Sequence, residues 1–476
     1  MKKFGIILMI MAILVGLFCI LSGCKEKEEA GDSIVYDIKI ELIENKLNGE
    51  QTVGYNNIYC DELTETVFHL YPNAYASDAE NPAYESELAS YGGIEINGVS
   101  VNGSDANYKL SDNKEYLIVS HEKVNKNDRV SISMKYCVSI PECNLRLGMK
   151  NGYYNLSGFY PQLSVYDDGF RTDKFCQIGD VSFSEAATYN INFTCDRSLV
   201  VAASVNCINV TNTEDKQILE YKGENVRDFA FACNADYNVI SAKAKNVDVY
   251  YFYVNDDKSK ENLDVAVKAL ETFCDTFGEY PFSTFSVARV PFKEDGMEYS
   301  GIVYISDICL NTEETIIHET AHQWWYGIVG NNCINESYLD EGLTTFSTAY
   351  YYELIGESDK YKNKIDGIKF AYMNYESLQK RRKTGENLSM NKPIYDFTEY
   401  RYAMVIYNKG CMMFENLYSL YGKEKFNEFL KSYCAENRYK IADKQALSDA
   451  ACDIFGDVNG LLEGWLGDNV LTTSFA

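Results

Sequence analysis

The amino-terminal half of the chain alternates apolar and polar residues with a period of two. From residue 34 to about residue 255, runs such as I-V-Y-D-I-K-I-E-L-I-E and R-V-S-I-S-M-K-Y are separated by turn-forming dipeptides such as N-G and D-D. A period of two places successive side chains on opposite faces of a strand. The pattern predicts an all-β domain, either a sandwich or a curved, saddle-shaped sheet. Its reactive side chains do not cluster as those of an independent active site would.

The period changes after residue 256. Leu263, Val267, Leu270 and Cys274 recur at helical spacing up to Gly278, which predicts an amphipathic helix with a glycine at its end. Two short strands, F-S-V-A-R-V-P-F and G-I-V-Y-I-S, follow with the loop D-G-M-E-Y between them, and the pattern beyond residue 347 is mainly helical. This half is therefore predicted to be an α+β domain.

The length and composition agree with a multidomain protein. A chain of 476 residues exceeds the usual size of one domain, and an apolar content of 46% is enough for packed cores. The expected layout is a leader over residues 1–24, a flexible tether over 25–32, the β domain over 33–245 and the α+β domain over 246–476.

The first residues have the layout of an export signal. Lys2 and Lys3 precede an apolar run over residues 4–21, and small residues follow. The ending L-S-G-C at Cys24 resembles the lipobox of bacterial lipoproteins, which implies a lipid anchor and a location on the extracytoplasmic face of a bacterial cell membrane. An uncleaved signal anchor is the alternative, and it also tethers the protein to a membrane.

Charge and cysteine content limit the partners. The net charge of −26 opposes binding to nucleic acid. Of the fifteen cysteines, Cys19 and Cys24 belong to the leader, and the odd number that remains has no repeated spacing. This favours scattered small apolar residues or free thiols over a designed disulfide framework. The oligomeric state and the pairing of the thiols stay open.

A metal-binding pattern follows the second short strand. His318, Glu319 and His322 form H-E-x-x-H, and Glu341 comes after eighteen intervening residues, on a second helix predicted to begin near Ser337. Residues i and i+4 of a helix lie on one face, so the two imidazoles can point at the same ion. Two histidines and one carboxylate leave one position of zinc open, which is typical of a catalytic site. The sequence predicts one Zn²⁺ per chain, held by His318, His322 and Glu341.

The words around these residues resemble one family. H-E-T-A-H-Q-W-W-Y-G and Y-L-D-E-G-L-T-T-F resemble the zinc motifs of the aminopeptidase N family of gluzincin metallopeptidases, which includes the leukotriene-hydrolase type enzymes. D-G-M-E-Y is similar to the family's G-x-M-E-N loop, and V-I-Y-N-K-G to its Y-x-K-G segment. F-H-L-Y-P-N-A-Y and G-F-Y-P-Q-L-S-V-Y-D resemble stretches of the amino-terminal domain of bacterial members. The resemblance covers nearly all of the mature chain and implies a thermolysin-like catalytic domain.

The resemblance also implies a function and roles for particular residues. It implies a zinc-dependent aminopeptidase that removes amino-terminal residues from peptides. Glu319 would act as the general base on the zinc-bound water, and Tyr407 would stabilise the oxyanion. Glu298 would hold the α-amine of the substrate, with Gly296 and Met297 in the same substrate-binding loop.

The chain departs from the family pattern in two ways. Tyr299 stands where the family has Asn and Asp295 where it has Gly, which bears on the shape of the first side-chain pocket. The sequence ends about 70 residues after Tyr407, so we expect a cleft with less cover than in larger members. Two alternatives therefore remain: a zinc endopeptidase of broader specificity, and a catalytically inactive zinc-binding surface protein for peptide capture. The natural substrate and the preferred amino-terminal residue stay open.

Overall fold

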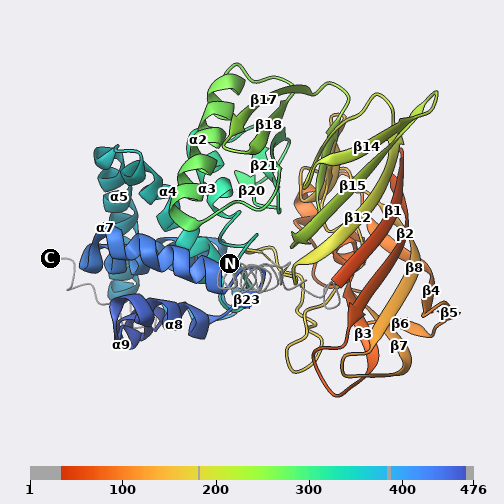
Figure 1. Ribbon diagram of the computed structural model, residues 1–476, viewed down its shortest axis with the longest axis horizontal. Helices are drawn as coiled ribbons and strands as arrows, with labels where there is room; N and C mark the ends of the chain where they lie inside the picture. Colours follow the sequence, from red (N-terminus) through yellow and green to blue (C-terminus); the bar gives the residue numbers. More distant parts are fainter. Residues whose placement is uncertain (1–33, 181–182, 383–387, 468–476) are drawn as a thin grey trace, which may run out of the picture.

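The computed structural model describes residues 34–180, 183–382 and 388–467. A β-rich half and a mainly helical half lie side by side (Figure 1). Within the described ranges, no helix has both the length and the apolar character that crossing a membrane requires. The predicted leader and tether, with the lipobox cysteine Cys24, lie outside the described residues.

The β-rich half is built on a large curved sheet. Its strand order is β14 (Cys207–Asn212), β15 (Lys216–Val226), β12 (Ala187–Asp196), β1 (Ile34–Ile43), β2 (Lys46–Asn56), β8 (Arg129–Ser139), β4 (Gly93–Val101) and β5 (Ser104–Asp105). Along β1 the residues Ile34, Tyr36, Ile38, Ile40 and Leu42 are buried, and the residues between them are more exposed. The predicted alternation is therefore confirmed, and it gives the sheet one core face and one outer face.

Two smaller sheets cover the core face of the large sheet. One has the order β13 (Val200–Ala203), β16 (Phe231–Asn234), β10 (Tyr153–Leu156) and β9 (Leu147–Lys150). The other has the order β11 (Gln162–Leu163), β3 (Glu62–His69), β7 (Tyr116–Asn125) and β6 (Tyr108–Leu110). Side chains from all three sheets, among them Ile38, Phe68 and Phe231, form one hydrophobic cluster. Short 3-10 helices, η1 (Tyr71–Tyr75) and η2 (Glu85–Glu87), lie in the connections.

The second half begins with a mixed sheet that carries the predicted metal motif on its flank. The strand order is β17 (Asn238–Ala244), β18 (Val247–Tyr253), β19 (Thr284–Val290), β21 (Ile302–Ser306) and β20 (Gly296–Met297). Val287, Val303 and Ile305 pack in one cluster with helices α2 (Ser259–Phe277) and α3 (Thr312–Ala321). The opposite face, with Ile302 and Tyr304, packs with residues of β13 and β16.

The boundary placed at residue 245 falls inside this mixed sheet. Residue 245 lies in the turn between β17 and β18, which pair as an antiparallel hairpin. The preceding strand, β16, pairs with β10 and β13 of the β-rich half. By strand pairing, the second half therefore starts at Asn238.

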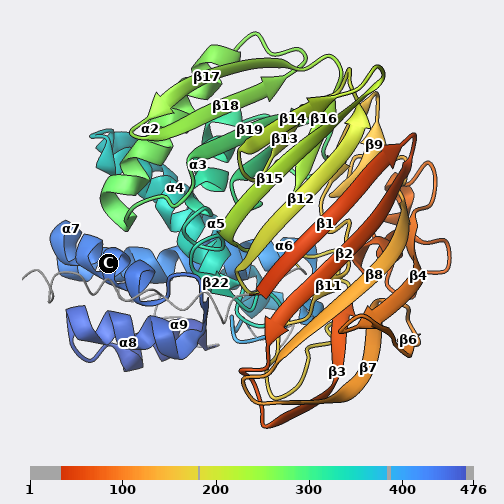
Figure 2. The ribbon, with the colours of Figure 1, turned by 45° about the vertical axis from the view of Figure 1, so that its right-hand side comes forward.

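The remainder of the chain is mainly helical, as predicted, and the second half is an α+β domain. In order it contains β22 (Gly330–Asn331), η3 (Tyr338–Gly342), α4 (Leu343–Leu354), α5 (Ser358–Arg382), η4 (Ile394–Asp396), α6 (Glu399–Tyr402), η5 (Ala403–Lys409), α7 (Gly410–Glu436), β23 (Ile441–Ala442), α8 (Lys444–Phe455) and α9 (Asn459–Leu466). Helices α7, α8 and α9 lie on the side away from the large sheet (Figure 2). The elements η3 and η5 are single π-helical turns.

Candidate metal centre and cleft

Helix α3 presents the two histidines of the H-E-x-x-H pattern. Glu313 and Glu314 occupy its first turn, where negative charge complements the helix dipole. The helix ends at Ala321, but His322 keeps helical backbone angles (φ −60°, ψ −18°). The Nε2 atoms of His318 and His322 are therefore only 3.2 Å apart.

Each imidazole is oriented through its other nitrogen. Nδ1 of His318 lies 3.1 Å from Oγ1 of Thr348. Nδ1 of His322 lies 2.9 Å from the carbonyl oxygen of Trp325 and 3.1 Å from Oγ1 of Thr344. Such partners fix the tautomer and the ring direction of a metal-binding histidine. Both Nε2 atoms are left facing a common point.

The carboxylate of Glu341 completes a three-donor set. Its Oε2 lies 3.4 Å from Nε2 of His318 and 3.3 Å from Nε2 of His322. Tetrahedral zinc with bonds of about 2.0–2.1 Å requires donors about 3.3 Å apart. Oε2 is buried and has no hydrogen-bond partner among the described residues, as expected for an atom that faces a metal ion. The donor types and their spacing both fit Zn²⁺, the cofactor of this site.

Glu341 and Tyr407 are both placed by π-helical turns. The second helix begins directly after Ser337, as predicted, but its first turn is the π turn η3, which contains Glu341. Tyr407 lies in the other π turn, η5, and donates a hydrogen bond to Oε1 of Glu341. Gly342 of η3 lies against Gly410, the residue directly after η5, and a Cβ on Gly342 would lie 2.9 Å from Cα of Gly410. Glycine at this contact allows the approach that joins Tyr407 to Glu341.

Glu319 lies beside the metal donors and is not one of the three. It is buried, and its Oε2 has no hydrogen-bond partner among the described residues. Burial raises the pKa of Glu319 to about 8 in the metal-free protein. A Cβ on Gly296 would lie 2.3 Å from Oε1 of Glu319, so only glycine lets the loop over residues 295–299 lie this close to it.

The loop over residues 295–299, predicted to bind substrate, places its residues in different surroundings. Glu298 is buried, with a carboxylate oxygen within 4.8 Å of donor atoms of Glu319 and His322. Met297 belongs instead to the hydrophobic cluster between the mixed sheet and the β-rich half. Gly296 and Met297 form β20, the edge strand of the mixed sheet at the cleft.

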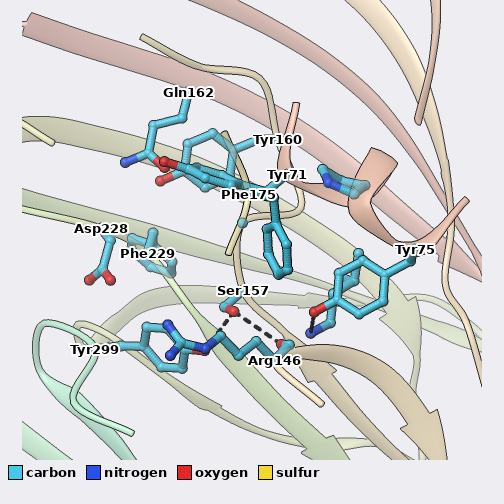
Figure 3. A pocket seen from close by; sticks show the side chains of 13 residues that line it. Tyr71, Tyr75, Arg146, Ser157, Tyr160, Gln162, Phe175, Asp228, Phe229 and Tyr299 are labelled. Atoms are coloured by element: carbon cyan, nitrogen blue, oxygen red, sulfur yellow. Dashed lines mark hydrogen bonds between the residues drawn. The ribbon is translucent and has the colours of Figure 1, made fainter. Parts of the chain in front are cut away.

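Tyr299, the replacement for the usual Asn, is not among the residues that line the cleft of the metal donors. Its hydroxyl lies 2.7 Å from Oγ of Ser157. It lines a separate small pocket of about 40 Å³, where its ring lies near Ser157 and Arg146 (Figure 3). The substitution therefore fills the junction with the β-rich half.

The β-rich half contributes two charged residues that the sequence did not reveal. Asp180 is buried, and its carboxylate lies within 4.8 Å of oxygens of Glu298 and Glu341. The guanidinium of Arg146 forms an ion pair with Asp180. Burial, followed by the neighbouring charge of Asp180, raises the pKa of Glu298 well above its usual range. No local pattern marks Asp180 or Arg146, because both lie in connections of the β-rich half, far along the chain from Glu298.

The metal donors hold a proton between them when no metal is bound. Burial opposes charge on His322, but the adjacent carboxylate of Glu341 outweighs it and raises the pKa of His322 to about 9. Burial lowers the pKa of His318. Burial also opposes charge on Glu341, but the two histidines hold the pKa of Glu341 well below its usual range.

These groups line a cleft between the two halves of the molecule. Its volume is about 740 Å³, which is within the range of ligand-binding clefts. The β-rich half supplies Tyr84, Arg146 and Asp180 to its walls, and the second half supplies the metal donors and Tyr407. The metal donors, Glu319 and Tyr407 therefore face a single open space.

Comparisons with known proteins agree with this geometry. Residues 261–465 match the family model described as the peptidase family M1 domain. The chain is 24% identical over 240 residues to the tricorn protease-interacting factor F2 of Thermoplasma acidophilum, a match covering 47% of this chain and 30% of the relative. It is 24% identical over 245 residues to aminopeptidase M1-D of Oryza sativa subsp. japonica, covering 48% of this chain and 27% of the relative. The matches thus span less than a third of the length of these two relatives.

Solved structures share the whole architecture. The M1 zinc metallopeptidase from Deinococcus radiodurans superposes with a TM-score of 0.68 at 17% identity, over 93% of this chain and 96% of that chain. A mutant of that enzyme bound to a Tyr-ser-ala substrate has a TM-score of 0.67 at 16% identity, over 92% of this chain and 95% of that chain. The chain therefore carries a peptidase family M1 domain, within the two-domain fold of the M1 zinc metallopeptidases.

Proposed function

We propose that this protein is a zinc-dependent aminopeptidase that hydrolyses amino-terminal residues from peptides. The observation that carries the proposal is the pairing of two sites in one cleft. A three-donor set with the spacing of a zinc site lies beside a buried carboxylate, Glu298, that has Asp180 next to it. The first site suits hydrolysis of an amide, and the second suits capture of a cation close to it.

The metal donors and Glu319 supply the hydrolytic chemistry. Zinc, when bound by His318, His322 and Glu341, supplies Lewis acidity that polarises a carbonyl and lowers the pKa of water. Glu319 takes the proton of the attacking water on its unpaired Oε2 and delivers it to the leaving amine. The raised pKa of Glu319, about 8 without metal, is lowered by the positive ion toward the neutral range in which a general base works best.

Tyr407 stabilises the charge that develops on the substrate. Burial keeps the pKa of Tyr407 well above its usual range, so the phenol holds its proton and can donate it in a hydrogen bond. In the free protein that bond goes to Oε1 of Glu341. When a substrate is bound, the hydroxyl turns to the oxyanion of the scissile carbonyl.

Glu298 and Asp180 select substrates with a free amino terminus. The two carboxyl groups form a buried acidic site within a few ångströms of the metal donors, where an arriving ammonium group favours the charged form of Glu298. An α-ammonium group there makes charge-assisted hydrogen bonds that are not screened by water. The scissile bond that then reaches the metal is the first one, which makes the hydrolase an exopeptidase.

The cellular location remains a proposal based on residues 1–24 alone. Their pattern resembles a lipoprotein leader, which places the enzyme on the outer side of a bacterial membrane, where it acts on extracellular peptides.

Matched peptides with free and acetylated amino termini test the proposed function. We expect zinc-dependent, stepwise release of amino-terminal residues from the free peptide, with loss of activity when a chelator is added. Equal cleavage of the free and acetylated peptides would exclude the exopeptidase mechanism and favour the endopeptidase alternative. Absence of cleavage of both by the zinc-loaded protein would favour peptide capture.

A further inference from the structure

Two consecutive buried residues of the β-rich half contact the turn that follows the H-E-x-x-H helix. Arg227 and Asp228 follow strand β15, and their exposed fractions are only 1% and 8%. A buried arginine is costly unless its donors are paired, so its contacts report what holds it in place.

The guanidinium of Arg227 is used to bind backbone carbonyls. Nε donates to the carbonyl oxygens of Tyr326 at 2.7 Å and Gly327 at 3.3 Å, and Nη2 donates to that of Ile328 at 3.4 Å. These three residues form the turn that follows the H-E-x-x-H helix. The guanidinium also packs closely against Gly330, two residues after this turn. A Cβ on Gly330 would lie 2.3 Å from the Cζ atom of Arg227.

Asp228 joins the same turn to the substrate loop. Its Oδ2 accepts a hydrogen bond of 2.6 Å from the hydroxyl of Tyr326. Its Oδ1 accepts one of 2.8 Å from the backbone N–H of Ser300, two residues after Glu298. One carboxylate from the β-rich half therefore ties the metal turn to the loop that carries the amine-binding glutamate.

The turn held in this way is strained at Tyr326. The backbone φ of Tyr326 is +148°, a region that residues other than glycine rarely adopt. Such a conformation persists only where the surroundings enforce it, and it is found mainly at functional sites. Arg227 binds the backbone carbonyl of Tyr326, and Asp228 binds the hydroxyl of Tyr326.

The strained turn acts directly on a metal donor. The carbonyl of Trp325, one residue before Tyr326, accepts the hydrogen bond from Nδ1 of His322. The direction of that carbonyl sets the direction of the imidazole, and hence of its Nε2. A change in the backbone at Tyr326 therefore reaches the metal through a single peptide unit.

We propose that Arg227 and Asp228 of the β-rich half are positioning residues of the zinc site, which hold the Tyr326 turn in its strained form so that Trp325 orients His322. The inference rests on the proposed function in that it takes His322 as a zinc ligand. It makes the β-rich half part of the metal site, in addition to its place in the cleft wall.

Two variants that each lose one buried tyrosine hydroxyl distinguish an effect on zinc binding from an effect on stability. Tyr326→Phe removes the hydroxyl that bonds Asp228. Tyr304→Phe is the matched control, because its buried hydroxyl also bonds across the junction, to the carbonyl of Phe231 and the N–H of Leu156, away from the metal turn. Metal-free samples of the full protein are titrated with zinc against a chromophoric chelator, and urea unfolding is measured in parallel.

We expect both tyrosine variants to lose stability, while only Tyr326→Phe loses zinc affinity, by about 10-fold or more, as for other partners of metal-binding histidines. Arg227→Lys keeps the charge but not the fork of donors, and it should show the same selective loss. Zinc affinities of Tyr326→Phe and Arg227→Lys equal to that of Tyr304→Phe would overturn the proposal. Failure of the wild-type protein to bind zinc would overturn the proposed function as well, so the two failures are distinguishable.

Discussion

Replacement of Glu298 by glutamine tests the assignment of the amine-binding site. The substitution keeps the size of the side chain and one oxygen acceptor, but it removes the carboxyl group that can become negative when an ammonium group binds beside it. Glu298 is only 4% exposed, so its interaction with an ammonium group is little screened by solvent. Asp180 and the metal donors keep their positions, so the change is confined to one charge.

The size of the effect follows from the contact that is lost. A hydrogen bond to a charged group contributes about 1.5–3 kcal/mol, and about 1.4 kcal/mol corresponds to a factor of ten. We expect kcat/KM for a peptide with a free amino terminus to fall by about 10- to 150-fold. The neighbouring carboxylate of Asp180 remains and partly compensates, which favours the lower part of this range. The kcat/KM for the acetylated peptide should not change.

The assay compares kcat/KM for the free and acetylated forms of one peptide in the wild type and in two variants. Glu294→Gln is the matched control, because Glu294 lies in the same loop and lines the same cleft but is exposed. Only Glu298→Gln should reduce the preference for the free amino terminus. An equal fall with both peptides, or the same effect in Glu294→Gln, would refute the role of Glu298.

Three further predictions concern the oxyanion, the metal and the core. Tyr407→Phe should lower kcat by about 10²–10³ with unchanged zinc content, and a kcat close to that of the wild type in steady-state assays would contradict its role. Zinc affinity should rise as the pH is raised from about 6 to about 9. The reason is that His322, whose pKa is about 9 without metal, must lose its proton before it can bind zinc. A zinc affinity that does not change with pH in chelator competition would contradict this. Phe273→Ala should lower the free energy of unfolding, measured with urea, by about 3–5 kcal/mol. The Phe273 ring is fully buried against Phe277, Trp324 and Tyr351. A decrease below about 1 kcal/mol would show that this core is not packed as described.

The sequence predicted the parts of the fold that depend on local periodicity. The helix read from Leu263 to Gly278 is α2, and it ends at Phe277, directly before that glycine. The strands on either side of the substrate loop are β19 and β21. In the structure, none of the thirteen described cysteines forms a disulfide.

Features that depend on contacts between distant segments could not be predicted. Glu341 lies in a π turn that packs closely against a distant segment, with Gly342 against Gly410, a contact that no sequence spacing encodes. Asp180 and Arg146 reach the cleft only because the β-rich half closes one of its walls. The strand β17 has the same alternating pattern as the strands before it, so its pairing with β18 in the mixed sheet, on either side of residue 245, was not visible in the sequence.

Metal content measured together with turnover in the wild type and in Glu319→Gln is the most direct test of the central claim. The variant keeps His318, His322 and Glu341, so both proteins should hold one zinc ion per chain, and only the wild type should release amino-terminal residues from a free peptide. A wild-type protein that holds zinc but turns over no faster than Glu319→Gln would contradict the account.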